Sequence, residues 1–412
     1  MLRLPQIRLS VNHLPVGRLF VWLPALAILV IALAAASCSQ LAPATACNLE
    51  APSASAAGPA CAEQWIDANV AINQLQSFGT HNSYKEKIAP AEMALIAERL
   101  PKVAPTLDYE HRSLAEQLDK GARQIELDPS DDPDGGLYST PLARKILSER
   151  GIALEPYDLS VMTKPGLKVI HVADIDYRSH CLLFVDCLKQ VKAWSDVHPR
   201  HTPILMMINP KSSGIPWAGA AKVIPWSRAA FDRMDVEIRS VFGEDQLLTP
   251  DDVRGSYATL REAVTSGGWP KLGQARGKVI FTMDLSPEAN APYGEGHPSL
   301  KGRVAFMTTF PDAPEAAYFT MNEPEAQQAD IQKLVREGFL VRTRADADTV
   351  EARAGTTARR EAALSSGAQY ISTDYLWPDP RFGTGYTASL PNGAVTRCNP
   401  VNAAKGCDAA AE

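Results

Sequence analysis

Short runs of β-forming residues alternate with amphipathic helical stretches from about Gln64 onward, and this alternation constrains the fold more than any other feature. Strands that alternate with helices predict βα units and a parallel sheet. We expect eight strands, at Leu75–Thr80, Ala122–Asp128, Leu167–Val172, Pro203–Ile208, Lys278–Asp284, Arg303–Thr308, Phe339–Arg344 and Gln369–Thr373. Helices are expected at Ser113–Lys120, Leu182–Trp194, Phe231–Phe242 and Ile331–Glu337. Eight strands with intervening helices favour a (β/α)8 barrel over an open sheet.

The size and charge of the chain suit one such domain and exclude one class of function. The chain has 412 residues, of which 45% are hydrophobic and 21% are charged, as is ordinary for a soluble globular protein. A (β/α)8 domain needs about 250 residues and tolerates insertions. The formal net charge is −6 and the basic residues are dispersed, which excludes nucleic-acid binding driven by phosphate neutralisation. No feature of the sequence indicates a protein partner.

The first 37 residues have the pattern of an export signal, because three arginines precede an apolar run over residues 19–36. The next residue, Cys38, follows Ala35-Ala36-Ser37, which matches a bacterial lipoprotein processing site. Lipidation of Cys38 would anchor the protein in the cell envelope. Ordinary cleavage near Ala36, with release to the periplasm or medium, and an uncleaved membrane anchor are the alternatives. Residues 38–63 are rich in Ala, Ser and Pro, which predicts a flexible linker before a barrel over residues 64–399 and a tail over 400–412.

Six of the seven cysteines form sequence-local pairs once Cys38 is set aside. The pairs are Cys47 with Cys61, Cys181 with Cys187, and Cys398 with Cys407. This spacing is typical of short disulfide loops in an oxidising compartment. The middle pair meets one geometrical objection, since residues six apart on a regular helix face different sides. The sequence has no Cys-x-x-Cys repeat, so zinc binding is not expected.

Polar and ionisable residues gather at the carboxyl ends of the expected strands, where (β/α)8 barrels carry their active sites. These residues are His81, Asn82, Glu126, Asp128, His171, Asn209, Asp284, Arg344 and Asp374. If they served folding alone they would cap the following helices, which we expect for Asp284 and consider for Asp374. Capping does not account for two histidines and a Glu-x-Asp pattern.

Glu126 and Asp128 are two residues apart on one strand, so their side chains point to the same face, the interior of a barrel. Two carboxylates at one barrel mouth repel each other unless a cation or a shared proton relieves them. Ca²⁺ accepts carboxylate and amide oxygens together. A surface edge strand with two solvated acids is the alternative.

Three motifs, taken in order, resemble those of phosphatidylinositol-specific phospholipases C of the calcium-dependent bacterial branch. They are Gly79-Thr80-His81-Asn82-Ser83-Tyr84, Glu126-Leu127-Asp128 and Lys168-Val169-Ile170-His171. Two later segments are also similar, Ser372-Thr373-Asp374-Tyr375 and Pro380-Arg381-Phe382-Gly383-Thr384-Gly385-Tyr386. The resemblance runs from about Gln74 to Asn399 and implies a TIM barrel of the phospholipase C-like phosphodiesterase type.

The resemblance also implies a reaction, in which the inositol 2-hydroxyl attacks the neighbouring phosphorus, diacylglycerol leaves and a cyclic phosphate forms. His81 would assist proton removal or bind the phosphoryl oxygen, and His171 would protonate the leaving alcohol. Asn82, Glu126 and Asp128 would hold Ca²⁺. Asn209 stands where the family usually supplies another acidic ligand. Its amide offers an oxygen but no charge, which predicts weaker calcium binding.

Lys211, Arg344 and Asp374 are the candidates for binding the substrate, expected to be a phospholipid or small phosphodiester at a membrane surface. Arg342 and Arg344 share one strand face, and Arg344 lies nearer the carboxyl end. For each cation a salt bridge without a functional role is the alternative. The nearest competing function is a glycerophosphodiester phosphodiesterase, although such enzymes usually carry His-Arg in place of His-Asn. A non-catalytic envelope lipid-binding protein is a third possibility, suggested only by Asn209.

Overall fold

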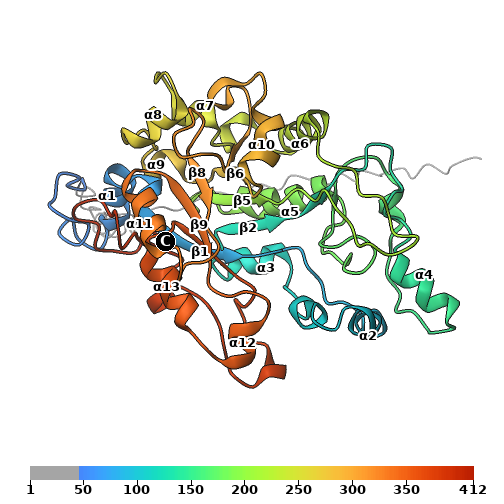
Figure 1. Ribbon diagram of the computed structural model, residues 1–412. Coiled ribbons are helices and arrows are strands. Elements are labelled where there is room, and N and C mark those ends of the chain that lie inside the picture. Colours follow the sequence, from blue (N-terminus) through green and yellow to red (C-terminus); the bar gives the residue numbers. More distant parts are fainter. Residues whose placement is uncertain (1–45) are drawn as a thin grey trace, which may run out of the picture. The chain divides into compact units, whose positions relative to one another are not determined.

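The structure is a computed structural model that describes residues 46–412, and its centre is formed by parallel strands surrounded by helices (Figure 1). One sheet has the order β11-β1-β10-β9-β8, with β1 Leu75–Thr80, β8 Tyr318–Thr320, β9 Leu340–Arg344, β10 Tyr370–Thr373 and β11 Thr396–Cys398. A second has the order β2-β5-β6-β7, with β2 Gln124–Leu127, β5 Ile204–Ile208, β6 Val279–Met283 and β7 Ala305–Met307. A separate antiparallel pair consists of β3 Pro129–Ser130 and β4 Lys168–Val169.

Every pairing within the two larger sheets is parallel except that of β11 with β1, so the fold is α/β with parallel and mixed sheets. The two sheets approach each other in two places, between β1 and β2 and between β7 and β8. The Arg123 N–H donates to the Phe78 carbonyl at 2.7 Å, and Thr308 forms a parallel bridge with Tyr318. Gly79 makes the first approach possible, because a Cβ there would lie 2.2 Å from the Gln124 carbonyl oxygen.

Seven of the eight predicted strands are confirmed, as β1, β2, β5, β6, β7, β9 and β10. The prediction for Leu167–Val172 is wrong as a strand of the parallel sheets. Only Lys168 and Val169 of that segment are extended as a strand, and they pair with β3 instead. Leu167, Val169 and Ile170 are buried, so their apolar pattern resembles that of a core strand. The strands β8 and β11, each of three residues, were not predicted from the sequence.

Helices cover the sheets, and the four that the sequence predicts are confirmed as α3, α5, α6 and α11. Ser113 caps α3 together with Glu116, and α6 buries Phe231, Met234 and Ile238 at helical spacing. The α-helices are α1 Ala62–Asn69, α2 Pro90–Arg99, α3 Leu114–Asp119, α4 Leu142–Glu149, α5 Phe184–Val197, α6 Arg228–Val241, α7 Pro250–Arg254, α8 Leu260–Thr265, α9 Leu272–Ala275, α10 Pro287–Gly294, α11 Gln328–Arg336, α12 Val350–Ala354 and α13 Ala358–Ser366.

The folded unit spans Cys47–Glu412 and is therefore longer at both ends than the predicted barrel over residues 64–399. Ala54 is fully buried, and the Ser55 N–H donates to the Asp408 carboxylate at 2.8 Å. The side chain of Glu412 binds Arg123 and accepts from the Thr202 N–H at 2.7 Å. Residues 47–63 and 400–412 are thus packed against the domain and do not form the expected linker and tail. The Ala- and Ser-rich composition predicted a flexible linker, but small side chains also allow close packing.

Three disulfides join the predicted pairs, Cys47–Cys61, Cys181–Cys187 and Cys398–Cys407. The helical objection to the middle pair does not apply, since α5 begins at Phe184 and Cys181 lies in the loop before it. The predicted leader and Cys38 lie outside the described residues. Within residues 46–412, we find no helix with the length and apolar character needed to cross a bilayer.

Candidate active site

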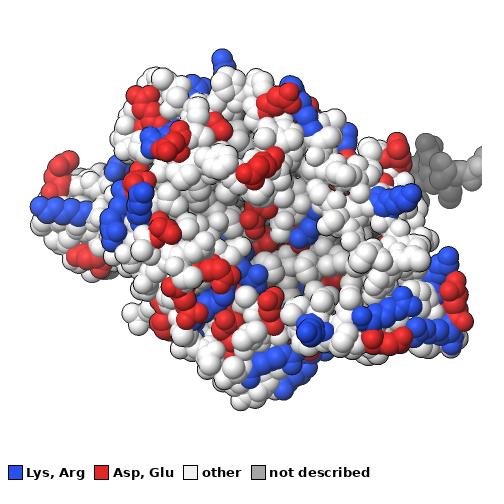
Figure 2. All heavy atoms as spheres, in the orientation of Figure 1, with Lys and Arg blue, Asp and Glu red and all other residues white. Residues whose placement is uncertain are grey.

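The carboxyl ends of the parallel strands bring most of the predicted site residues together. His81 and Asn82 follow β1, Asp128 follows β2, Asn209 follows β5 and Asp374 follows β10. Glu126 lies within β2 and Arg344 ends β9, whereas His171 comes from the loop after β4. In the space-filling view, acidic and basic side chains meet in a hollow near the middle of the visible face, close to β1 and β2 in the matching ribbon view (Figure 2).

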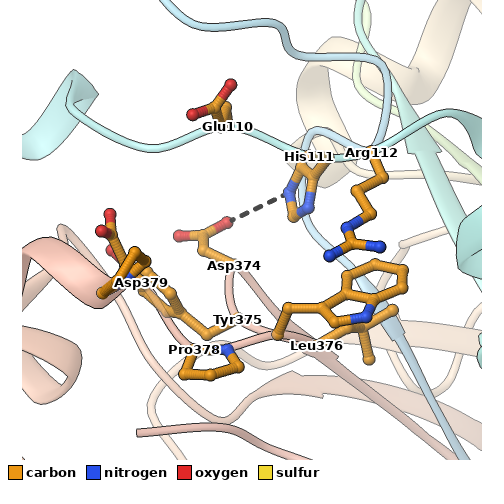
Figure 3. Close-up of a pocket in the computed structure, with 10 residues that line it drawn as sticks. Glu110, His111, Arg112, Asp374, Tyr375, Leu376, Pro378 and Asp379 are labelled. Atoms are coloured by element: carbon orange, nitrogen blue, oxygen red, sulfur yellow. Dashed lines mark ion pairs between the residues drawn. The ribbon is translucent and has the colours of Figure 1, made fainter. Parts of the chain in front are cut away.

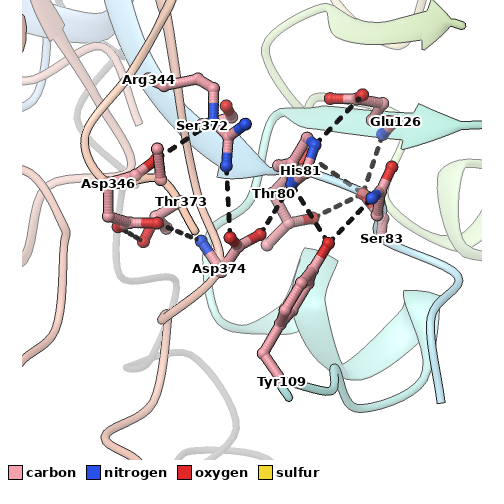
Figure 4. A network of polar contacts seen from close by, with 12 residues as sticks. Thr80, His81, Ser83, Tyr109, Glu126, Arg344, Asp346, Ser372, Thr373 and Asp374 are labelled. Carbon is pink, nitrogen blue, oxygen red and sulfur yellow. Dashed lines mark hydrogen bonds and ion pairs between the residues drawn. The ribbon is translucent and has the colours of Figure 1, made fainter. Parts of the chain in front are cut away.

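His81 is fixed by two partners on one ring nitrogen. Its Nδ1 lies 2.9 Å from Asp374 Oδ1 and 3.3 Å from the Tyr109 hydroxyl (Figure 4). The opposite nitrogen, Nε2, lies 3.9 Å from Glu126 Oε1, and 16% of the side chain is exposed. Burial, followed by the charges of Arg344 and Arg342, holds the pKa of His81 well below its usual range. The imidazole is therefore neutral near pH 7.

A network behind His81 orients Asp374. The Asp374 N–H donates to Asp346 Oδ1 at 2.8 Å, and Arg344 Nη2 donates to Asp374 Oδ2 at 3.3 Å. Asp346 also accepts from the hydroxyls of Thr373 and Tyr386. Burial raises the pKa of Asp374, and the Arg344 charge opposes the rise. Asp374 does not cap a helix, so the capping interpretation is wrong, and its nearest partner is the histidine.

His171 has a separate carboxylate. Its Nδ1 lies 2.8 Å from Asp176 Oδ2, and the other oxygen of Asp176 accepts from Lys85 Nζ at 3.0 Å. Lys85 and Asp176 are both fully buried. Burial alone would raise the pKa of Asp176, but the Lys85 charge and the hydrogen bond with His171 outweigh it and the net shift is downward. Asp176 thus keeps its negative charge beside the imidazole.

Asn82 lies between the two histidine arrangements and has φ 48°, in the left-handed region that Asn tolerates. In one orientation its amide nitrogen donates to the Tyr109 hydroxyl at 2.8 Å, and its oxygen faces the Asp128 carboxylate. Turned over, the amide donates to both Asp128 oxygens, at 3.2 and 3.0 Å, and accepts from His171 Nε2 at 3.3 Å. The second orientation satisfies these hydrogen bonds with no ion present, whereas the first would need a cation between the amide oxygen and the two carboxylate oxygens.

Each carboxylate of the Glu-x-Asp pair already has a basic partner. Arg342 Nη2 donates to Glu126 Oε2 at 2.7 Å, while Glu126 Oε1 is buried and has no hydrogen-bond partner among residues 46–412. Lys211 Nζ lies 2.7 Å from Asp128 Oδ2. Burial raises the pKa of Glu126, Arg342 opposes the rise, and the charges of Asp128 and Asp284 add to it. The two buried carboxylates therefore lie beside two basic side chains, and the raised pKa means that Glu126 binds a proton more readily than an exposed glutamate.

The oxygen donors fit a hard divalent cation. The unpartnered Glu126 Oε1 and the amide oxygen that Asn82 can turn toward Asp128 are atoms that such an ion would satisfy. Asn209 is half-buried at the end of β5, where its backbone N–H donates to the Leu127 carbonyl. Within residues 46–412, no three or more His, Cys, Asp or Glu side chains group as metal ligands do. The candidate set contains two carboxylates and two amides, so only two of its four members are of those residue types.

Several residues that support the site were not predicted from the sequence. Tyr109, Asp176 and Asp346 contact predicted residues, and Lys85 contacts Asp176. All but Tyr109 lie within five residues of a predicted site residue, so proximity in the sequence was the one signal that could have found them. Asp284 was expected to cap a helix, but Ser286 caps α10, whereas the charge of Asp284 acts on Glu126.

A pocket of about 320 Å³ adjoins the network and has Asp374 and His111 in its wall (Figure 3). Its other lining residues are Glu110, Arg112, Tyr375, Leu376, Trp377, Pro378, Asp379 and Pro380. His111 Nε2 lies 2.7 Å from the His81 carbonyl oxygen and 3.9 Å from Asp374 Oδ1. Burial lowers the pKa of His111 to about 4. Neutral His111 therefore supports the backbone at His81.

The sequence model of one protein family matches most of the folded unit. It is the family described as phosphoinositide phospholipase C, Ca²⁺-dependent, and the match covers residues 70–400. Among functionally curated proteins, none shows significant sequence similarity to this chain.

Solved structures similar to this chain include two bacterial enzymes. The calcium-dependent phosphoinositol-specific phospholipase C of a Pseudomonas species is 16% identical, with a TM-score of 0.49, over 80% of this chain and 96% of its own. The calcium-dependent phosphatidylinositol-specific phospholipase C of Streptomyces antibioticus is 20% identical, with a TM-score of 0.47, over 79% of this chain and 99% of its own. PLC21 of L. pealei is 11% identical, with a TM-score of 0.35, over 76% of this chain and 35% of its own. The family assignment rests on the family match.

Proposed function

Because this chain belongs to the Ca²⁺-dependent phosphoinositide phospholipase C family, we propose that it cleaves a phosphoinositide-like phosphodiester to a cyclic phosphate and diacylglycerol. The observation that carries the proposal is the pair of imidazoles, each fixed by its own carboxylate, on either side of Asn82. Two fixed imidazoles can accept one proton and deliver another without moving the backbone.

His81 is the proton acceptor in this proposal. Its Nδ1 donates to Asp374 when the ring is neutral, which leaves a lone pair on Nε2 for the proton of the attacking 2-hydroxyl. The lowered pKa of His81 keeps that lone pair available near neutral pH. The 2-hydroxyl oxygen forms the new bond to phosphorus as the bond from phosphorus to the glycerol oxygen breaks.

His171 is the proton donor to the departing glycerol oxygen. Asp176, at 2.8 Å from Nδ1, stabilises the imidazolium that must be present before the transfer. Lys211 and Arg344 supply positive charge for the phosphodiester, and Asp374 remains a candidate for substrate contact beside its role toward His81. Asn82, Glu126, Asp128 and Asn209 would hold Ca²⁺, which when bound polarises the phosphate and makes the attacking hydroxyl more acidic.

We also propose a barrel architecture and a cellular location for this protein. The hydrogen bond from Arg123 to Phe78 and the bridge between Thr308 and Tyr318 support a single (β/α)8 barrel formed by β1, β2, β5, β6, β7, β8, β9 and β10. The three disulfides support an oxidising location. We therefore expect export through residues 1–37 and action at a membrane surface, with Cys38 as the lipidated residue.

Product analysis tests the reaction. Purified protein should release a cyclic inositol phosphate and diacylglycerol from phosphatidylinositol vesicles in Ca²⁺, and none when the ion is chelated. Glycerol release from glycerophosphoinositol without a cyclic product would support a glycerophosphodiester phosphodiesterase. Vesicle binding without turnover of any phosphodiester would support a lipid-binding protein.

Calcium titrations of activity test the ligand set. Asn209→Glu should lower the Ca²⁺ concentration for half-maximal activity, because it adds an anion beside a divalent cation. Asp128→Asn should raise that concentration. Equal half-saturation in the wild type and both variants would remove Asn209 and Asp128 from the metal site, and full activity in chelator would remove the metal.

A further inference from the structure

The two cations beside the carboxylate pair differ in how firmly they are held. Arg342 is 1% exposed, and its guanidinium spans Glu126 Oε2 at 2.7 Å and Asn322 Oδ1 at 2.6 Å. Lys211 is 22% exposed, and in the described part of the chain Asp128 is the one carboxylate that its ammonium pairs with. A guanidinium fixed at two points stays in place, whereas a flexible lysine at the mouth can withdraw into solvent.

Lys211 also binds a carboxylate oxygen of Asp128 that the proposed metal would use. Its Nζ is 2.7 Å from Asp128 Oδ2, and Asn82 can direct its amide oxygen at the same carboxylate. The neutral Asn209, two residues before Lys211 along the chain, adds no anion that would draw a divalent ion in. The short distance and the missing anion both favour the ammonium over a weakly held ion.

We propose that Lys211 is a tethered cation that competes with Ca²⁺ for Asp128. This inference rests on the proposed calcium site and specifies how the site is regulated. With both carboxylates ionised, as binding of a divalent cation requires, Glu126, Asp128 and Arg342 carry one net negative charge once Lys211 withdraws. That charge suits one divalent cation shared with one singly charged phosphodiester. The displaced ammonium remains at the mouth, where it can pair with the substrate phosphate.

The test is direct measurement of Ca²⁺ binding by isothermal titration calorimetry, without substrate. Lys211→Met and Lys211→Gln remove the competing charge and should bind Ca²⁺ roughly 5- to 150-fold more tightly than the wild type, the usual range of coupling between two sites. Lys211→Arg keeps the charge and should stay near the wild-type affinity. Lys222→Met is the matched control, because Lys222 is exposed on the loop that follows Lys211.

Thermal melting shows whether the neutral variants are folded. Removing Lys211 leaves Asp128 buried and unpaired, so Lys211→Met should melt at a lower temperature than the wild type without Ca²⁺. Added Ca²⁺ should then raise its Tm more than that of the wild type. Lys211→Gln retains a hydrogen-bond donor for Asp128 and serves if Lys211→Met does not fold.

The outcomes separate this inference from the proposed function. Equal Ca²⁺ affinity in the wild type and both neutral variants, or the same tightening in Lys222→Met, would overturn the competition. Failure of every variant to bind Ca²⁺ would overturn both the competition and the metal site. Tighter binding in the neutral variants with no cyclic product from phosphatidylinositol would support the role of Lys211 and overturn the proposed reaction.

Discussion

The two histidines have similar partners but different surroundings. His81 is held by a carboxylate 293 residues away in the sequence, and that carboxylate belongs to a network with Arg344 and Asp346. His171 is held by a carboxylate five residues away, which shares its charge with Lys85. The first pair depends on the sheet and the second on one loop.

The comparison teaches that a His–Asp contact alone does not assign a role. Burial raises the pKa of Asp374, while burial and two nearby guanidiniums lower the pKa of His81. In the other pair the Lys85 charge overcomes burial and the pKa of Asp176 is lowered. A neutral imidazole suits proton acceptance, and an imidazole beside a persistent anion suits proton donation. The proposed roles thus rest on the charges around each pair.

Replacing each imidazole should give the largest effect and separate the two roles. His81→Ala and His171→Ala should each reduce kcat on phosphatidylinositol by about 10² to 10⁴-fold, the usual contribution of a positioned acid or base. An inositol phosphodiester with a nitrophenol leaving group needs no protonation on departure. On that substrate His171→Ala should recover most of its activity and His81→Ala should not. His198→Ala, at the exposed end of α5, is the control. Equal recovery of both variants would contradict the assignment.

Removing each supporting carboxylate should affect stability unequally. Asp176→Asn leaves Lys85 buried and unpaired, which should lower the free energy of unfolding by about 3 to 5 kcal/mol in urea denaturation. Adding Lys85→Met should restore most of that loss. Asp374→Asn should cost less, because burial already disfavours its charged form and Arg344 keeps its bond to the Asp346 carbonyl. If Asp374→Asn is the more destabilising change, Asp374 contributes more as a charged group than Asp176 does, contrary to our comparison.

His111 provides the smallest effect and tests the neutral surroundings of His81. Its pKa is about 4 in the folded protein, below the ordinary value of 6.5, so the unfolded chain takes up a proton first as the pH falls. The stability it contributes is complete above pH 6.5 and is lost toward pH 4, up to about 3 kcal/mol in all. His111→Gln should therefore flatten the decline of unfolding free energy between pH 7 and pH 5. An unchanged slope would show that His111 is protonated in the fold.

The rim of the site could be predicted from the sequence, because strand ends followed by His, Asn and Asp are local patterns. The ion pairs could not. Arg342 and Glu126 are 216 residues apart in the sequence, and no local pattern identifies one as the partner of the other. From the sequence, Glu126 is a candidate metal ligand and Arg342 is a neighbour of Arg344 on one strand face, and nothing links the two.

The same limit applies at residues 131–134, because the composition Asp-Asp-Pro-Asp taken alone would indicate a solvated turn. Asp131 and Asp132 are both buried, Asp131 against Arg233 and Asp132 at 3.1 Å from Lys168. Turn composition indicates where the chain bends. It carries no information on which distant basic side chain forms an ion pair with the acidic residues of the bend.

The pairing of β11 with β1 has a practical consequence for handling the protein. Residues 75–77 of β1 pair with residues 396–398, so the last strand protects an edge of the central sheet, and Cys398–Cys407 ties that strand to the segment after it. A strand whose N–H and C=O groups are left unpaired at a sheet edge can pair with strands from other molecules. Truncation before residue 396, or a fusion that displaces Glu412 from Arg123, would therefore favour aggregation during production, even though every change lies far from the chemistry.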